Sequence, residues 1–254
     1  MGSFLSWLRQ ALSGASAAPA ETPLSSNPRF GQEPPIEIAP HLSLVPLLHA
    51  AGFGGSDAWA KDLHAPMRVH SIRGPRRVAA FLATIGHESN GGRHLEELLS
   101  YSAERLLAVA MESPPGSLWR RSFPDLDTAR LYARKPKELA DVIYGGRMGN
   151  SAPGMGFLYR GRGLIQITGF NNYRDAEKAL GLPLVKHPEM AAEPKNAAMI
   201  AAWWWASNGC NELADDGEVD RWRRRVNGGL KGLADVRRRY FDVLAAIGNQ
   251  NLGA

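Results

Sequence analysis

Glu88 is the residue whose type and position most directly indicate chemistry. The apolar residues Val78, Phe81, Leu82 and Ile85 recur at helical spacing, and Glu88 continues the same stripe. An ionised carboxyl that faces the core near a helix C-terminus is disfavoured by desolvation and by the helix dipole. Both effects favour the protonated form, which a general acid working near neutral pH requires. The alternative is a structural glutamate at the edge of the core, paired with an arginine.

Glu97 is the second carboxylate of interest, nine residues after Glu88 and next to Glu96. The glycines at 91 and 92 break the helix, so the loop that follows is expected to let Glu97 fold back across a cleft from Glu88. Two carboxyl groups in unlike environments, a buried Glu88 and a solvated Glu97, are what glycoside hydrolysis needs. The alternative is an ordinary solvated pair of glutamates on the surface.

Other catalytic and metal-binding patterns fail on their spacing. His87 and Glu88 begin an H-E-x-x-H motif, but position 91 is Gly91, so a zinc site of that type is excluded. The serine hydrolase pattern G-x-S-x-G is absent. Cys210 is the only cysteine and follows a tryptophan-rich apolar segment, so we expect it to be inert. We therefore expect neither a metal nor a cofactor.

The chain is basic, with 30 Lys and Arg against 25 Asp and Glu, a net charge of +5 and a pI near 9.5. This charge favours anionic partners, among which nucleic acid, anionic lipid and cell-wall polymer all qualify. The arginine-rich stretches 221–225 and 237–239 are interpreted as solvated helix faces rather than nucleic-acid contacts. No apolar run approaches the roughly 20 residues of a membrane-spanning helix, so no stable membrane span is expected.

From residue 36 onward the apolar pattern predicts helices separated by short loops. Pro75 suits the first turn of a helix. Ser102 is predicted to cap the helix that follows it, and Asn171 to cap another. The segment 196–207 is apolar nearly all round, so it is expected to be the central buried helix.

One segment departs from the helical pattern. In residues 160–169, β-branched side chains stand between glycines, which is typical of a short strand. Alternation would place Gln166 and Thr168 on one face of that strand. The predicted fold class is therefore mostly α: a helical domain with a small β element that lines the substrate cleft.

The first 35 residues differ from the rest and are predicted to be an arm or linker. Six of the 17 prolines lie within the first 40 residues, which favours extended chain. A short amphipathic stretch at residues 4–12 comes before them. We expect no cleaved signal peptide, because the segment before the apolar stretch lacks positive charge and Arg9 interrupts the stretch itself.

Taken together, these residues resemble glycoside hydrolase family 19, the chitinase family that also includes many phage endolysins. The matching stretches are residues 85–89, 97, 101–104, 132–134, 144–150, 159–169, 171–173 and 226–229. They occur in a consistent order over roughly residues 36–247. The short interval from Glu88 to Glu97 is similar to the compact phage type, whereas the plant enzymes have a longer loop there.

The resemblance implies a lysozyme-like helical catalytic domain over residues 36–254 and an inverting mechanism. By that analogy Glu88 is the general acid that protonates the glycosidic oxygen. Glu97 is then the general base that activates a water on the opposite face of the sugar, and Thr168 helps to hold this water. Inversion requires the two carboxyl groups to lie roughly 6.5–9.5 Å apart.

The resemblance also implies a set of substrate-binding residues. Gln166, Asn172 and Asn227 match positions that hydrogen-bond the N-acetyl sugar, and Tyr159 is taken as a further substrate-binding residue. The chain departs from the family pattern at Lys231, where many of the chitinases carry a glutamate.

The expected function is that of an endolysin, a lysozyme-type glycosidase that cleaves the β-1,4 glycan strands of peptidoglycan. We expect a monomer that is made in the host cytoplasm, acts on the cell wall from the periplasm and has no nucleic-acid partner. The first alternative is a chitinase that acts on poly-N-acetylglucosamine. A catalytically inactive glycan-binding protein is the alternative from another class, and a nucleic-acid-binding module is a more distant one.

Overall fold

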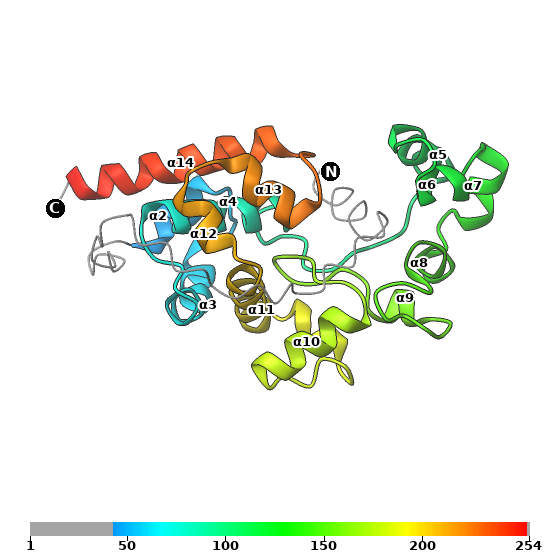
Figure 1. Cartoon of the computed structure of the whole chain (residues 1–254), viewed down its shortest axis with the longest axis horizontal. Coiled ribbons are helices and arrows are strands. Elements are labelled where there is room, and N and C mark those ends of the chain that lie inside the picture. The colour runs from blue at the N-terminus through cyan, green and yellow to red at the C-terminus, as the bar shows by residue number, and fades with distance from the viewer. Residues whose placement is uncertain (1–42, 253–254) are drawn as a thin grey trace, which may run out of the picture.

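Helices form nearly all the regular structure of the chain, which the computed structural model describes over residues 43–252 (Figure 1). The predicted arm at residues 1–35 lies outside the described residues, as does the amphipathic stretch at 4–12. In chain order the elements are α2 (Leu44–Ala50), α3 (Ser56–Val69), α4 (Pro75–Glu88), α5 (Ala103–Glu112), α6 (Leu118–Ser122), α7 (Leu126–Tyr132), α8 (Pro136–Tyr144), α9 (Met155–Leu158), α10 (Phe170–Leu180), the 3-10 helix η1 (Pro188–Ala192), α11 (Pro194–Ser207), α12 (Cys210–Asp215), α13 (Val219–Asn227) and α14 (Leu233–Leu252).

The buried side chains form two separate hydrophobic cores. The main core contains the buried residues of α2–α4, α10–α14 and the turn at 164–167. The second core contains those of α5–α8, among them Trp119, Phe123 and Leu139. Figure 1 shows α5–α8 gathered on one side, with the chain crossing to them from α4 through residues 89–102 and returning through 145–169. The two crossing segments hold most of the predicted site residues.

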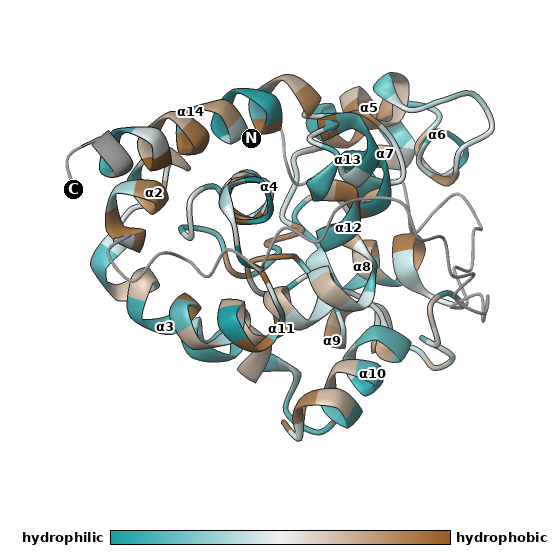
Figure 2. Cartoon of the chain, turned by 60° about the vertical axis from the view of Figure 1, so that its left-hand side comes forward, coloured by the Kyte–Doolittle hydropathy of each residue, from teal (hydrophilic) through white to brown (hydrophobic). Residues whose placement is uncertain are grey.

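Helix α4 lies inside the main core. It begins at Pro75, as predicted, and every residue from Val78 to Glu88 is buried. Figure 2 shows α4 surrounded by other helices, and α14 packs along it. Helix α11 buries seven of its 14 residues, so the segment 196–207 is a helix of the core as predicted, but the central buried helix is α4. The mostly helical fold class is likewise confirmed.

The helix caps follow the sequence at some positions and not at others. The Ser102 side chain accepts a hydrogen bond from the amide of Arg105 and caps α5, as predicted. The prediction that Asn171 caps a helix is wrong, because α10 already begins at Phe170 and so includes Asn171. Its N-cap is Gly169, whose φ of +87° is readily adopted only by glycine.

The predicted small β element is wrong: the residues that the structure describes contain no strand. Residues 162 and 167 exchange two backbone hydrogen bonds of 3.1 and 2.9 Å across a tight turn, which makes only an isolated bridge. Gln166 has φ +56°, in the left-handed region. A residue in that conformation ends the alternation of side chains, so the segment cannot continue as a strand.

Close packing of α4 against the turn after α2 gives a first testable prediction. A Cβ at Gly86 would lie 2.5 Å from the carbonyl oxygen of Ala51. Gly86→Ala is therefore expected to lower the free energy of unfolding by about 1–3 kcal/mol, although alanine favours helix by about 1 kcal/mol. Gly248→Ala in α14 meets nothing within 4 Å and serves as the control. Equal urea midpoints for the two variants would contradict the close contact.

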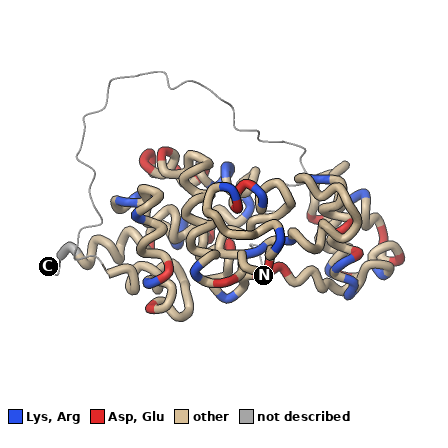
Figure 3. Tube along the Cα trace, turned by 90° about the horizontal axis from the view of Figure 1, so that it is seen from below, with Lys and Arg blue, Asp and Glu red and all other residues tan. Residues whose placement is uncertain are grey.

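Charges of both signs are interspersed along the described chain (Figure 3). In the predicted arginine-rich helix faces, Arg221 and Arg237 pair at the surface with Asp216 and Asp220. Arg223 is buried completely, so the prediction of a solvated side chain is wrong there; the reason is its buried acidic partner. Within residues 43–252 we find no helix with the length and apolar character needed to cross a bilayer.

Candidate active site

Glu88 is the last residue of α4, and its side chain is 2% exposed. Nη1 of Arg223, on α13, donates a hydrogen bond of 2.5 Å to Oε1 of Glu88. Nε of the same guanidinium donates to the carbonyl of Lys231 at 2.7 Å. The buried position agrees with the apolar stripe, and the arginine partner is the one that the structural interpretation of Glu88 expected. The carboxyl group is therefore held by α13 and by the loop after it.

Glu97 is also buried, so the prediction that it is solvated is wrong. The hydroxyl of Tyr144 lies 2.8 and 3.0 Å from the two carboxyl oxygens, and the amide of Gly161 donates to Oε2 at 3.0 Å. Burial raises the pKa of Glu97 to about 7, even though these hydrogen bonds and the charges of Arg160 and Arg162 act in the opposite direction. Glu97 therefore exchanges its proton near neutral pH.

Glu96 forms ion pairs with the two arginines that lie near Glu97. Its Oε1 accepts hydrogen bonds of 2.6 Å from Arg160 and 2.7 Å from Arg162. The Glu96 side chain is 41% exposed, whereas that of Arg162 is 4% exposed. The two adjacent glutamates therefore differ in role: Glu96 forms ion pairs, and Glu97 is held by neutral donors.

Three polar side chains converge beside Gly161. A Cβ placed on this glycine would lie 2.8 Å from Gln166 Oε1, 3.2 Å from Thr168 Oγ1 and 3.3 Å from Glu97 Oε2. Gln166 and Thr168 are both buried. The side chains of Gln166 and Thr168 lie on the same side, as predicted, but the tight turn places them there and not a strand. The structure therefore joins Glu97, Thr168 and Gln166, three of the predicted site residues.

The other predicted site residues make local contacts. Asn227, the last residue of α13, is 3% exposed and donates to the carbonyls of Gly229 and Lys231. Since Arg223 donates to the same Lys231 carbonyl, Asn227 is linked indirectly to Glu88. Asn172 donates to the Thr168 carbonyl at 2.7 Å.

The Tyr159 side chain belongs to the main core. Its hydroxyl donates to the Val185 carbonyl at 3.0 Å, and its ring packs edge-on against Phe170 and Tyr173. These contacts account for its burial without a sugar. None of these contacts joins Tyr159 to Glu88 or Glu97.

The sequence interpretation missed a network behind Glu88. Nδ1 of His87 lies 2.8 Å from Oδ2 of Asp235, at the start of α14. Asp235 also accepts from Arg239 and Arg238. The His87 hydrogen bond first, and then those of the two arginines, hold the pKa of Asp235 well below its usual range. This network ties the end of α4 to α14 and so supports Glu88 from behind.

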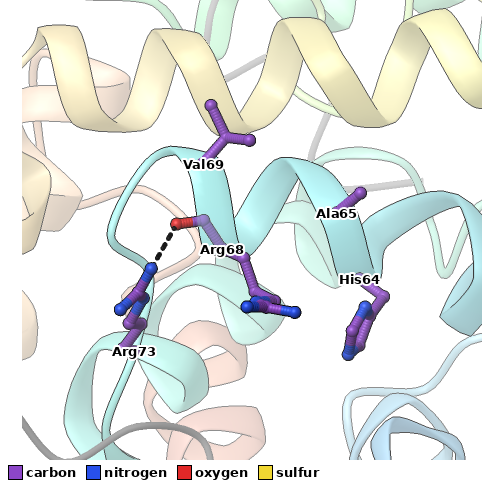
Figure 4. A pocket seen from close by; sticks show the side chains of 5 residues that line it. All are labelled: His64, Ala65, Arg68, Val69 and Arg73. Carbon is purple, nitrogen blue, oxygen red and sulfur yellow. Dashed lines mark hydrogen bonds between the residues drawn. The ribbon is translucent and has the colours of Figure 1, made fainter.

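A surface cavity of about 330 Å³ lies elsewhere, on α3, and is lined by His64, Ala65, Arg68, Val69 and Arg73 (Figure 4). None of the predicted site residues lines it, so it is not the candidate active site. Over the described range, no group of three or more His, Cys, Asp or Glu side chains is arranged to hold a metal ion.

Gly161 gives a testable prediction because its φ is not in the left-handed region and an alanine fits its backbone. Gly161→Ala is expected to leave the fold intact, with an unfolding change within about 1–3 kcal/mol. The added methyl group would displace Gln166 and press on Thr168 and Glu97. We therefore expect a loss of hydrolysis of at least about tenfold, measured as kcat/KM on soluble glycan. Unchanged hydrolysis would show that the convergence beside Gly161 is not part of the site.

The chain is similar in sequence to known glycosyl hydrolases and chitinases. A "Glycosyl hydrolase family 19 domain-containing protein" of Haemophilus influenzae is 39% identical over 173 residues, which are 67% of this chain and 80% of the relative. An endochitinase of Arabidopsis thaliana is 42% identical over 71 residues, 28% of this chain and 25% of the relative. An inactive endochitinase of the same plant is 39% identical over 77 residues, 26% of this chain and 28% of the relative. No family model matches the chain.

Solved structures are similar in fold at low sequence identity. A mutant of chitinase C superposes with a TM-score of 0.51 at 16% identity, covering 86% of this chain and 96% of that one. Chitinase C from Streptomyces griseus gives a TM-score of 0.50 at 14% identity, covering 91% and 83%. These likenesses concern the fold alone.

Proposed function

Since the chain belongs to glycoside (glycosyl) hydrolase family 19, we propose that it is an endolysin that cleaves the β-1,4 bonds of peptidoglycan glycan strands. The observation that carries the proposal is the pair of buried glutamates, Glu88 and Glu97, held on separate segments by different partners. Buried carboxyl groups with fixed hydrogen bonds are suited to acid–base work on a glycosidic bond.

The proposed roles follow the family resemblance. Glu88 protonates the leaving oxygen, Glu97 activates a water and Thr168 helps to hold it, with inversion at the anomeric carbon. A pKa of about 7 suits Glu97 to act as a base near neutral pH. Gln166, beside Thr168, and Asn227, linked to Glu88 through Lys231, are proposed to bind the N-acetyl sugar. Asn172 and Tyr159 are proposed to support the substrate-binding residues.

Charge supports peptidoglycan as the substrate. The polymer is anionic, whereas this chain carries a net charge of +5, so attraction would concentrate the enzyme on the cell wall and weaken as salt rises. We place its action as a monomer in the periplasm, after synthesis in the host cytoplasm. The second candidate is a chitinase, favoured by the local identity to plant endochitinases.

Mass spectrometry of digested peptidoglycan tests the proposal, because it identifies the sugar at each new reducing end. The expected products are disaccharide-peptides that end in N-acetylmuramic acid or N-acetylglucosamine. Soluble chitin oligosaccharides are digested in parallel, and the Glu88→Gln variant is the control in both assays. Cleavage of chitin alone would support the chitinase. Binding of either polymer without cleavage would support an inactive glycan-binding protein, as one plant relative is described as inactive.

A further inference from the structure

Tyr144 connects the second core to Glu97. It is the last residue of α8, it is completely buried, and its ring packs in the second core with Leu139 and Ile143. Its hydroxyl lies 2.8 Å from Oε1 and 3.0 Å from Oε2 of Glu97. A hydroxyl has one hydrogen to donate, so it serves one carboxyl oxygen at a time. The shorter distance indicates Oε1.

Gly161 holds the other oxygen of the same carboxyl group. Its amide donates to Oε2 at 3.0 Å, and its carbonyl accepts from the Glu97 amide at 2.9 Å. The carboxyl group is therefore fixed from two sides: by the end of α8 in the second core and by the turn that belongs to the main core. Two donors on different oxygens set the plane of the carboxyl group as well as its position.

The donors that orient the Glu97 carboxyl group are neutral, because the nearby arginines bind its neighbour. Arg160 and Arg162 bind Glu96, and Tyr101 is a second, partly buried phenol close enough to interact with Glu97. Burial, and then the nearby Glu97 charge, raise the pKa of Tyr144 well above its ordinary value. Tyr144 therefore keeps its proton and remains a donor over the pH range in which Glu97 titrates.

We propose that Tyr144 is a positioning residue that orients the Glu97 carboxylate toward the side where Thr168 and Gln166 converge, and that it is not merely a core side chain. The proposal rests on the function assigned to Glu97. In this proposal the second core contributes to catalysis, because it holds the Tyr144 hydroxyl against the carboxyl group of Glu97, the proposed general base.

Tyr144→Phe tests the proposal, since it keeps the ring in the core and removes only the donor. We expect kcat on soluble glycan to fall about tenfold with KM little changed. The low-pH limb of kcat/KM should move to higher pH, because a lost donor weakens the carboxylate form of Glu97. In an NMR titration that follows the ¹³C chemical shift of the Glu97 carboxyl group, the midpoint should likewise move to higher pH.

Tyr240→Phe is the matched control, because Tyr240 is a buried tyrosine of the main core that packs on Trp222. It should change neither the titration of Glu97 nor the pH profile. If Tyr144→Phe also leaves both unchanged, the positioning role is overturned. If the titration shifts while neither polymer is hydrolysed by the wild type, the positioning contact stands and the proposed function fails.

A second measurement covers the case in which Tyr144→Phe does not fold. In the wild-type protein the hydroxyl proton of Tyr144 should appear as a slowly exchanging downfield NMR resonance, because it is buried and hydrogen-bonded. Glu97→Ala should abolish that resonance. Its persistence in Glu97→Ala would show that the hydroxyl does not donate to Glu97 and would overturn the proposal.

Discussion

Replacing Glu88 by glutamine is expected to lower kcat/KM on glycan strands by about 10²–10⁴-fold, the usual contribution of a positioned general acid. Glutamine keeps an oxygen that accepts from Arg223 but carries no proton that it can give to the leaving sugar. The loss should appear in kcat, because the proton is transferred only as the bond breaks. Hydrolysis is measured by the release of reducing ends.

The same replacement has a cost in stability that must be measured separately. Arg223 is fully buried, and the variant replaces its carboxyl partner by an amide, which is a weaker acceptor for a buried guanidinium. Full truncation, Glu88→Ala, is expected to cost about 3–5 kcal/mol of unfolding free energy. Glu112→Gln is the control, because its pair with Arg105 is exposed and worth about 1 kcal/mol or less. Activities are compared at temperatures where every variant is folded.

An aryl glycoside with a good leaving group tests whether Glu88 acts as the acid. Such a leaving group departs without protonation, so Glu88→Gln should lose little activity on it while Glu97→Gln loses most. The test is sharp because burial raises the pKa of Glu97 to about 7, so Glu97 can carry a proton near neutral pH and must be shown not to be the acid. If Glu97→Gln is the variant that this substrate rescues, the two roles are reversed.

Glu97→Gln is expected to give the second large effect, again a fall in kcat of about 10²–10⁴-fold, because an amide cannot take a proton from water. In the wild type the activity should rise with pH and level off above about 7, where Glu97 is ionised. The variant's residual activity should lack this dependence. A variant that retains the wild-type pH limb would show that another group is titrating.

Glu97 should also change stability with pH in a defined direction. Its pKa is raised from an ordinary 4.5 to about 7, so between these values the folded state binds more protons than the unfolded state. Its contribution to stability is fully present below about pH 4.5 and is lost as pH rises to about 7. The total loss is about 3 kcal/mol.

The difference between Glu97→Gln and the wild type isolates this effect from all other titrating groups. Relative to the wild type, the variant should gain about 3 kcal/mol of unfolding free energy between pH 4.5 and 7. Urea unfolding at several pH values measures the difference. Parallel stability curves would mean that Glu97 is not protonated more readily in the folded protein.

Local patterns predicted much of the framework of the site. The apolar stripe and Pro75 gave α4 and the buried position of Glu88, and Ser102 gave the start of α5. The turn at 161–168 was misjudged as a strand because β-branched residues between glycines suit both, and only the left-handed Gln166 distinguishes them.

The environment of the carboxyl groups was not predictable in the same way. Glu97 is buried by Tyr144 and Gly161, which lie 47 and 64 residues away in sequence. Arg223 is 135 residues from Glu88. An exposed-looking Glu-Glu pair and an arginine-rich helix carry no local sign of such partners, because burial is decided by how distant helices pack. The burial of Glu97 and the arginine partner of Glu88 therefore emerge only in the folded chain.

The anomeric configuration of the first product tests the central claim, that Glu88 and Glu97 act as an acid and a base across one sugar. Early ¹H NMR spectra of a digested soluble glycan resolve the two anomers before they equilibrate. An inverting pair, separated by roughly 6.5–9.5 Å to admit a water, releases the α anomer first from a β-1,4 linkage. Initial release of the β anomer would mean retention and would contradict the account.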